Sequence, residues 1–115
     1  MSAAVVFPAY GSPDVLEVID VGEPVAGPGE VRIAMRAAGV QPFDCKLRHG
    51  DMDGYVPVTF PQVLGNELAG VIDQVGAEVE GFAVGDEVMA FMFLGAYAEH
   101  VVVPADNVVR KPEAL

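Results

Sequence analysis

The segment GPGEVRIAMRA, residues 27–37, carries the strongest structural signal in this chain. After the turn residues Gly27-Pro28-Gly29, apolar side chains fall at every second position, as they do in a strand with one buried face. A β-strand is therefore predicted over Glu30–Ala37. The residues predicted to point inward are Val31, Ile33, Met35 and Ala37.

Short apolar runs interrupted by glycine and proline continue along the whole chain. The 115 residues include 13 glycines and 9 prolines, and 52% are hydrophobic, which is typical of many short strands and not of long helices. One compact core takes roughly 100 to 150 residues, so a single domain is expected. Further strands are predicted at Ala3–Phe7, Val15–Val21, Leu68–Val75, Asp86–Phe93 and Tyr97–Val103, and the apolar run Val88–Leu94 predicts burial on both faces.

One helix is predicted, over Pro42–His49. Proline suits the first turn of a helix, Phe43 and Leu47 lie four residues apart on one face, and Gly50 stands in the stop position. An irregular loop is expected to follow over residues 51–63.

The charge balance indicates which partners are unsuitable. Seventeen acidic and six basic side chains give a net charge of −11. Nucleic acid is a poor partner, because binding phosphates needs clustered Lys and Arg, and the same sign disfavours an anionic membrane surface. No apolar run approaches the roughly 20 residues that span a bilayer, and a single cysteine excludes an internal disulfide, so a cytoplasmic protein is expected.

Few residues carry a recognisable chemistry of their own. Cys45 and His49 are four apart in the predicted helix and could offer a thiolate and an imidazole to zinc, but a zinc site needs at least three protein ligands. We therefore favour a cysteine beside a surface histidine without metal. The glycine-rich phosphate-binding motifs Gly-x-Gly-x-x-Gly and Gly-x-x-x-x-Gly-Lys-Ser/Thr are absent.

The segment LGNELAGV, residues 64–71, sets a polar pair among apolar residues at the entry to a strand. Burial of Glu67 would be costly unless its carboxylate were paired or hydrogen-bonded, which would indicate a site. A carboxylate at the strand end in water explains the pattern equally well, so both interpretations stay open.

Six pieces of sequence form a pattern when they are taken in order. They are PAYG at 8–11, PGEV at 28–31, AGVQPFD at 38–44, PQVLGNELAG at 61–70, VG at 75–76 with GFAVGDEV at 81–88, and GAYAE at 95–99. Together they resemble the medium-chain dehydrogenase/reductase group, and within it the zinc-free NADPH:quinone oxidoreductase branch. The resemblance extends over essentially the whole chain.

The resemblance implies a mainly β fold for residues 1–115, a GroES-like, partly open β-barrel with one or two short helices. In the family this barrel is the N-terminal part of the catalytic domain, and the nicotinamide lies in the cleft between it and a Rossmann domain. That second domain is absent from this chain. The chain is thus expected to be a fragment that is inactive alone.

The resemblance also implies site residues. Gln41 and Asn66 stand where the zinc enzymes of the family carry a cysteine and a histidine, and amides bind zinc poorly, so no metal site is expected. Gln41 and Asp44 match the zinc-free motif Gly-Val-Asn-x-x-Asp near the nicotinamide, and Glu67 matches an acid at the cleft edge. These three are the expected cofactor-binding residues, and Tyr55 is the nearest candidate for a catalytic loop tyrosine.

The function implied is hydride transfer from NADPH to a quinone or an α,β-unsaturated carbonyl compound, with the loop 51–63 contacting the substrate. Most of the NADPH affinity would come from the missing domain. A homo-oligomer is expected. The alternative is a GroES-like interaction or oligomerisation module without enzymatic activity, which would need a long mobile loop early in the chain, where residues 24–28 are short and turn-like.

Overall fold

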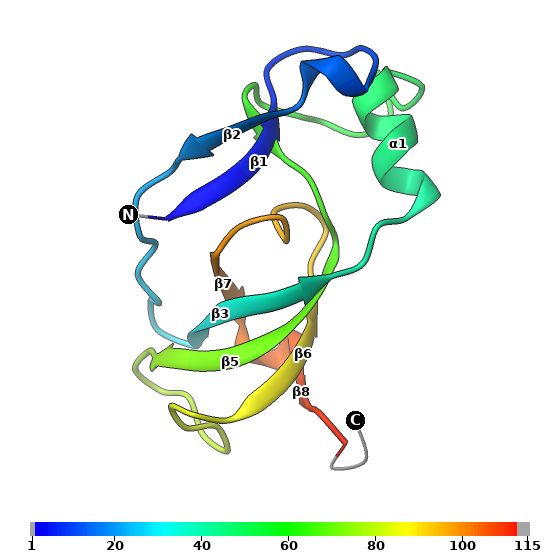
Figure 1. Ribbon diagram of the computed structural model, residues 1–115. Helices are drawn as coiled ribbons and strands as arrows, with labels where there is room; N and C mark the ends of the chain where they lie inside the picture. The colour runs from blue at the N-terminus through cyan, green and yellow to red at the C-terminus, as the bar shows by residue number, and fades with distance from the viewer. Residues whose placement is uncertain (1, 113–115) are drawn as a thin grey trace.

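The computed structural model describes residues 2–112 and contains two antiparallel sheets and one α-helix (Figure 1). The smaller sheet has the strand order β2-β1-β4, with bounds Glu17–Asp20, Ala3–Phe7 and Gln62–Val63. The larger has the order β7-β3-β5-β6-β8, with bounds His100–Pro104, Glu30–Ala38, Glu67–Val75, Glu87–Phe91 and Val108–Arg110. The helix α1 spans Pro42–His49, and two 3₁₀ turns, η1 and η2, span Pro13–Val15 and Ala105–Asn107.

Strand β3 contains the segment with the strongest sequence signal and lies inside the larger sheet. Val31 and Ile33 are fully buried, as the alternation predicts. The register with β5 shifts twice, and such irregularities bend a strand. Opposite β3, a β-carbon on Gly70 would come 2.2 Å from the Ala34 carbonyl oxygen, so the two backbones approach closely there.

Residues 97–99 join the two sheets. The amide of Val5 in β1 donates to the Tyr97 carbonyl at 2.9 Å, and the amide of Glu99 donates to the Ala3 carbonyl at the same distance. The amide of Met35 in β3 donates to the Glu99 carbonyl, also at 2.9 Å. The sheets therefore wrap around one core without closing, which confirms the predicted mainly β, partly open barrel. The core residues are Ala4, Val6, Val31, Ile33, Leu68, Ile72, Val88, Ala90, Ala96, Ala98, Val101, Val103 and Val108.

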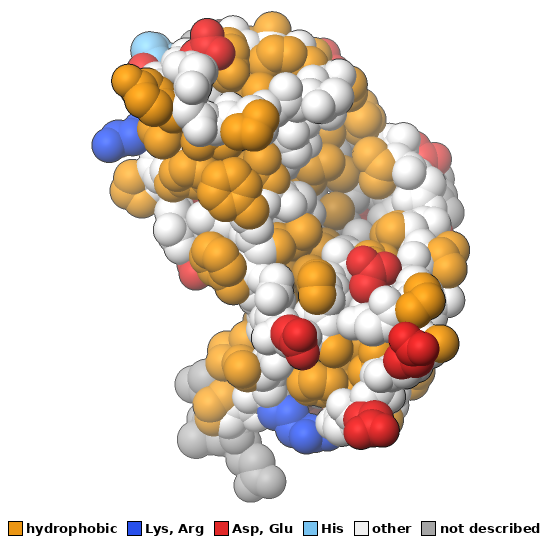
Figure 2. Space-filling model, turned by 180° about the vertical axis from the view of Figure 1, so that it is seen from behind, with side chains coloured by type: hydrophobic (Ala, Val, Ile, Leu, Met, Phe, Trp, Pro, Cys, Tyr) orange, Lys and Arg blue, Asp and Glu red, His pale blue; other side chains and the backbone are white. Residues whose placement is uncertain are grey.

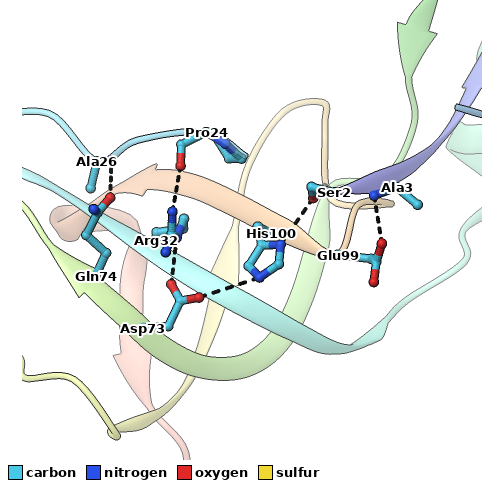
Figure 3. A network of polar contacts seen from close by, with 9 residues as sticks. All are labelled: Ser2, Ala3, Pro24, Ala26, Arg32, Asp73, Gln74, Glu99 and His100. Carbon is cyan, nitrogen blue, oxygen red and sulfur yellow. Dashed lines mark hydrogen bonds and ion pairs between the residues drawn. The ribbon is translucent and has the colours of Figure 1, made fainter. Parts of the chain in front are cut away.

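A polar network links the start of β1 to the larger sheet (Figure 3). Asp73 of β5 accepts from Arg32 Nε of β3 at 2.8 Å and lies 3.6 Å from His100 Nε2 of β7. The other ring nitrogen of that histidine lies 3.1 Å from the buried Ser2 hydroxyl. Charges and polar groups are thus paired across three strands at the side of the barrel.

A second, smaller core lies beneath α1 and the 51–63 loop. It is formed by Phe7, Leu47, Val56 and Leu64, and Phe60 packs edge-on against Phe7. The helix ends where predicted, because Gly50 takes a left-handed conformation with φ of 104° and donates to the Lys46 carbonyl. No helix in residues 2–112 is long and apolar enough to cross a membrane.

Three expectations about the strands need correction. The strand predicted over Val15–Val21 is only Glu17–Asp20, because Pro13–Val15 forms a 3₁₀ turn. The apolar run Val88–Leu94 is not buried on both faces: β6 ends at Phe91, which is 57% exposed at a position facing away from the core. The last long strand begins at His100, since residues 97–99 bridge the two sheets instead.

Candidate functional site

Asp44 occupies the centre of the candidate site and is 3% exposed. It is the third residue of α1, where a carboxylate is stabilised by the helix N-terminus. Its Oδ2 atom accepts two hydrogen bonds, from the Gln41 backbone amide at 3.0 Å and from the Tyr97 hydroxyl at 2.8 Å. The structure thus joins Gln41 and Asp44 by a hydrogen bond and adds a tyrosine.

Tyr97 is the site residue that the sequence reasoning missed, although it lies in the quoted segment GAYAE. Its hydroxyl also lies 3.3 Å from the Gly39 carbonyl oxygen. Its ring packs on Gly65, where a β-carbon would come 2.5 Å from the ring carbon Cδ1. Desolvation, followed by the hydrogen bond and charge of Asp44, raises the pKa of Tyr97 well above its ordinary value. The hydroxyl therefore stays protonated and acts as a donor.

Glu67 begins β5 and lies beside the same link between β3 and α1. Its carbonyl accepts from the Gly39 amide at 3.2 Å, and its carboxylate packs where a β-carbon on Gly39 would stand. It is half-buried and lines an open groove of about 590 Å³. The structure places the Glu67 carboxylate in the wall of this open groove, half-buried at the start of the strand.

Two buried oxygens near this cluster have no hydrogen-bond partner among the described residues: Asp44 Oδ1 and Asn66 Oδ1. A buried acceptor without a donor costs about 1–3 kcal/mol, so native structures generally supply one. Asn66 directly follows the glycine that seats the Tyr97 ring. The cluster thus contains two buried acceptors for which no described residue supplies a donor.

The groove is apolar apart from few polar groups, and none of its lining side chains, all within residues 2–112, is cationic. The lining residues are Ala37, Ala38, Gly39, Glu67, Leu68, Ala69, Met89, Ala90, Phe91, Asn107 and Val109. Figure 2 shows a hollowed face of the molecule on which hydrophobic and acidic side chains dominate and Lys and Arg lie at the margins. Such a surface suits an uncharged ring better than a phosphate.

The remaining candidate side chains are all exposed. Tyr55 is 84% exposed and lines a different pocket, with Tyr10 and Phe60. Cys45 is exposed, and His49 pairs with Asp51 at 2.9 Å. Within residues 2–112 no three His, Cys, Asp or Glu side chains gather as a metal site would require.

Residues 27–113 match the alcohol dehydrogenase GroES-like domain family. The chain belongs to that family. This GroES-like domain is 40% identical over 116 residues to a quinone oxidoreductase of Pseudomonas aeruginosa, in an alignment that covers 100% of this chain and 35% of the relative. The chain thus spans about a third of the length of that curated relative.

Solved structures agree with this assignment. The GroES-like domain superposes on the human synaptic vesicle membrane protein VAT-1 homolog-like protein with a TM-score of 0.94 and 33% identity, covering 100% of this chain and 37% of that one. It superposes on the Escherichia coli quinone oxidoreductase complexed with NADPH with a TM-score of 0.90 and 29% identity, covering 98% and 34%. The resemblance to the quinone oxidoreductase branch is confirmed.

Proposed function

We propose that this chain is the barrel part of an NAD(P)H-dependent oxidoreductase that reduces a quinone or an α,β-unsaturated carbonyl compound. The observation that carries the proposal is the cluster of Gln41, Asp44 and Tyr97, with the buried acceptors of Asp44 and Asn66 left open. The similarity to quinone oxidoreductases supports it.

The described residues fit the nicotinamide end of NADPH, which supplies a hydride when bound. A carboxamide has two N–H donors, and these suit the unfilled oxygens of Asp44 and Asn66. Gln41 would orient the same group from the start of α1, and Glu67 would bound it at the groove wall. The apolar lining of the groove would form one wall against the reacting ring.

The same residues do not fit the phosphates of NADPH. The net charge is −11, and no cationic side chain among residues 2–112 lines the groove. Phosphate binding therefore falls to parts of the protein beyond this chain, in line with the share of its relatives that the chain spans.

A titration tests this division. The 115-residue chain is expected to show no saturable NADPH binding at micromolar concentrations, whereas a polypeptide that extends to the full length of the relatives should bind NADPH and oxidise it when 1,4-benzoquinone or an enone is added. Saturable binding by the short chain would contradict the division of binding between the two parts. The proposed function would be overturned if the long polypeptide failed to oxidise NADPH both with the quinone and with the enone.

We propose further that the reaction is zinc-independent. The support is the donor set: two amides, of Gln41 and Asn66, are the groups that this chain offers where zinc enzymes of the family carry ligands, and amides are poor zinc ligands. NADPH oxidation by the long polypeptide should be unchanged after dialysis against a chelator. Loss of activity that zinc restores would disprove this part of the proposal.

The substrate side and the assembly follow from exposed residues. We propose that the 51–63 loop, with the exposed Tyr55, contacts the substrate.

Exposed apolar side chains such as Val40 and Phe93 support self-association into a homo-oligomer. Sedimentation at high protein concentration tests this assembly, and a strict monomer would contradict it.

A cytoplasmic location stays part of the proposal, because a single cysteine fits a reducing compartment.

A further inference from the structure

We propose that Tyr97 is a positioning residue: its hydroxyl holds the Asp44 carboxylate and the link 39–41, and thereby sets the place of Gln41 at the cleft. This inference rests on the function proposed above. The hydroxyl donates to Asp44 Oδ2 at 2.8 Å, and the Gln41 amide donates to the same oxygen at 3.0 Å. Both bonds use one oxygen, so they fix the carboxylate and leave Oδ1 as its open acceptor.

The link 39–41 connects β3 to α1 and has few other attachments. It belongs to neither element, and its middle residue, Val40, is 75% exposed. The Gly39 amide is held by the Glu67 carbonyl at 3.2 Å, and the Gln41 amide is held by Asp44. The Tyr97 hydroxyl lies 3.3 Å from the Gly39 carbonyl at one end of the link, and it reaches Gln41 at the other end only through the Asp44 oxygen that both groups share.

The seat of the Tyr97 ring does not depend on this hydroxyl. The ring packs against Gly65, whose φ of 97° favours glycine. The Tyr97 amide donates to the Leu64 carbonyl, and its carbonyl accepts from the Val5 amide, both at 2.9 Å. Removing the hydroxyl alone therefore leaves the seat intact, and its consequence falls on Asp44 and the link.

The tyrosine acts as a donor and not as an acid. Burial and the neighbouring Asp44 raise its pKa, so the hydroxyl keeps its proton over the working range of an enzyme. Among the described residues, the hydrogen-bond partners of the hydroxyl are Asp44 and Gly39. Its effect on a reaction must therefore pass through these two residues.

The first test is kinetic and uses the long polypeptide with its cofactor-binding part. Tyr97→Phe should lower kcat for NADPH oxidation by on the order of 10-fold, because a misplaced nicotinamide ring slows hydride transfer. The KM for NADPH should change little, because the phosphate contacts lie elsewhere. The matched control, Ser12→Ala, removes an exposed hydroxyl that makes no capping bond. An unchanged kcat in a folded Tyr97→Phe enzyme would overturn the proposal, as would a KM increase without loss of kcat.

The second test measures amide hydrogen exchange in the 115-residue chain. Tyr97→Phe should speed exchange of the Gln41 amide about 10-fold or more, because its acceptor on Asp44 is loosened. The Val5 amide, which reports on the tyrosine seat, should be unchanged. Unaltered Gln41 exchange would refute the positioning role. This readout is independent of catalysis. Inactivity of the unmutated long polypeptide would therefore refute the proposed function but not the positioning role of Tyr97.

Discussion

The carboxylate of Glu67 lies against the backbone of Gly39, so closely that a β-carbon at Gly39 would come within 2.0 Å of Glu67 Oε1. The two residues are also joined by the bond from the Gly39 amide to the Glu67 carbonyl. A side chain at position 39 would therefore push the acid away, and the absence of one is what lets the acid form the groove wall.

Gly39→Ala should consequently displace the Glu67 side chain while costing little stability, about 1 kcal/mol or less, since the obstructing atoms belong to a flexible side chain. The matched substitution Gly70→Ala should cost more, about 2–4 kcal/mol, because the added carbon meets the Ala34 carbonyl oxygen at 2.2 Å. Urea unfolding of both variants measures the difference. Equal losses would show that the space around Gly39 is as rigid as that around Gly70.

Stability at high pH should depend on Tyr97. Its pKa is raised in the folded chain, by desolvation first and by Asp44 second, whereas an unfolded tyrosine titrates near pH 10. Above about pH 10 the unfolded state therefore binds fewer protons than the folded state, and the free energy of unfolding falls as pH rises. Below about pH 10 both states keep the proton and this contribution is constant.

Tyr97→Phe should lack that part of the decline. The measurement is urea unfolding from pH 8.5 to 11 for both proteins, because the contribution of Tyr10, which also titrates high, is common to the two and cancels. Parallel curves for the two proteins would count against a raised pKa at position 97.

The Asp73 network should contribute measurably to stability. Asp73→Asn removes the charge that Arg32 Nε meets at 2.8 Å in a partly buried setting, and about 1–3 kcal/mol should be lost. The control is Asp51→Asn, because the pair that Asp51 forms with His49 is mostly exposed and should contribute nothing measurable at pH 8. Chemical unfolding at that pH compares them, and equal effects would argue that the network is no stronger than a surface pair.

The side-chain carboxamide of Gln41 should matter for catalysis. In the long polypeptide, Gln41→Asn should retain most of kcat, since the amide is kept one methylene shorter, whereas Gln41→Ala should lose on the order of 10-fold. Both variants retain the backbone amide that donates to Asp44, so this contact at the helix start is preserved. Steady-state NADPH oxidation measures both. If alanine were tolerated as well as asparagine, the side chain would have no role.

Local signals predicted some elements to the residue. The helix α1 has its predicted bounds because proline at its first position and glycine after its last act through the backbone alone. Strands β4 and β8 were missed, since two or three residues are too few to show a period. The exposed end of β6 was misjudged because an apolar run does not tell which neighbours will cover it.

The candidate site shows the same division. The motif with Gln41 and Asp44 was visible because its residues are neighbours in the chain, joined by a capping interaction. Tyr97 was not visible as their partner, because a lone tyrosine between two alanines has no local pattern that points to a carboxylate 53 positions earlier.

By itself, the sequence determined the strand character of most segments, the single helix and the acidic charge, because periodicity, proline, glycine and charge act over a few residues or are simple sums. The family was indicated by the resemblance of six short motifs in their order. Only the tertiary structure decided that Tyr97, Asp44 and Gln41 share one carboxylate oxygen, that Glu67 lies on Gly39, and that two buried acceptors stay open. Those contacts join distant parts of the chain. They depend on residues 97–99 lying between β1 and β3, which no local pattern encodes.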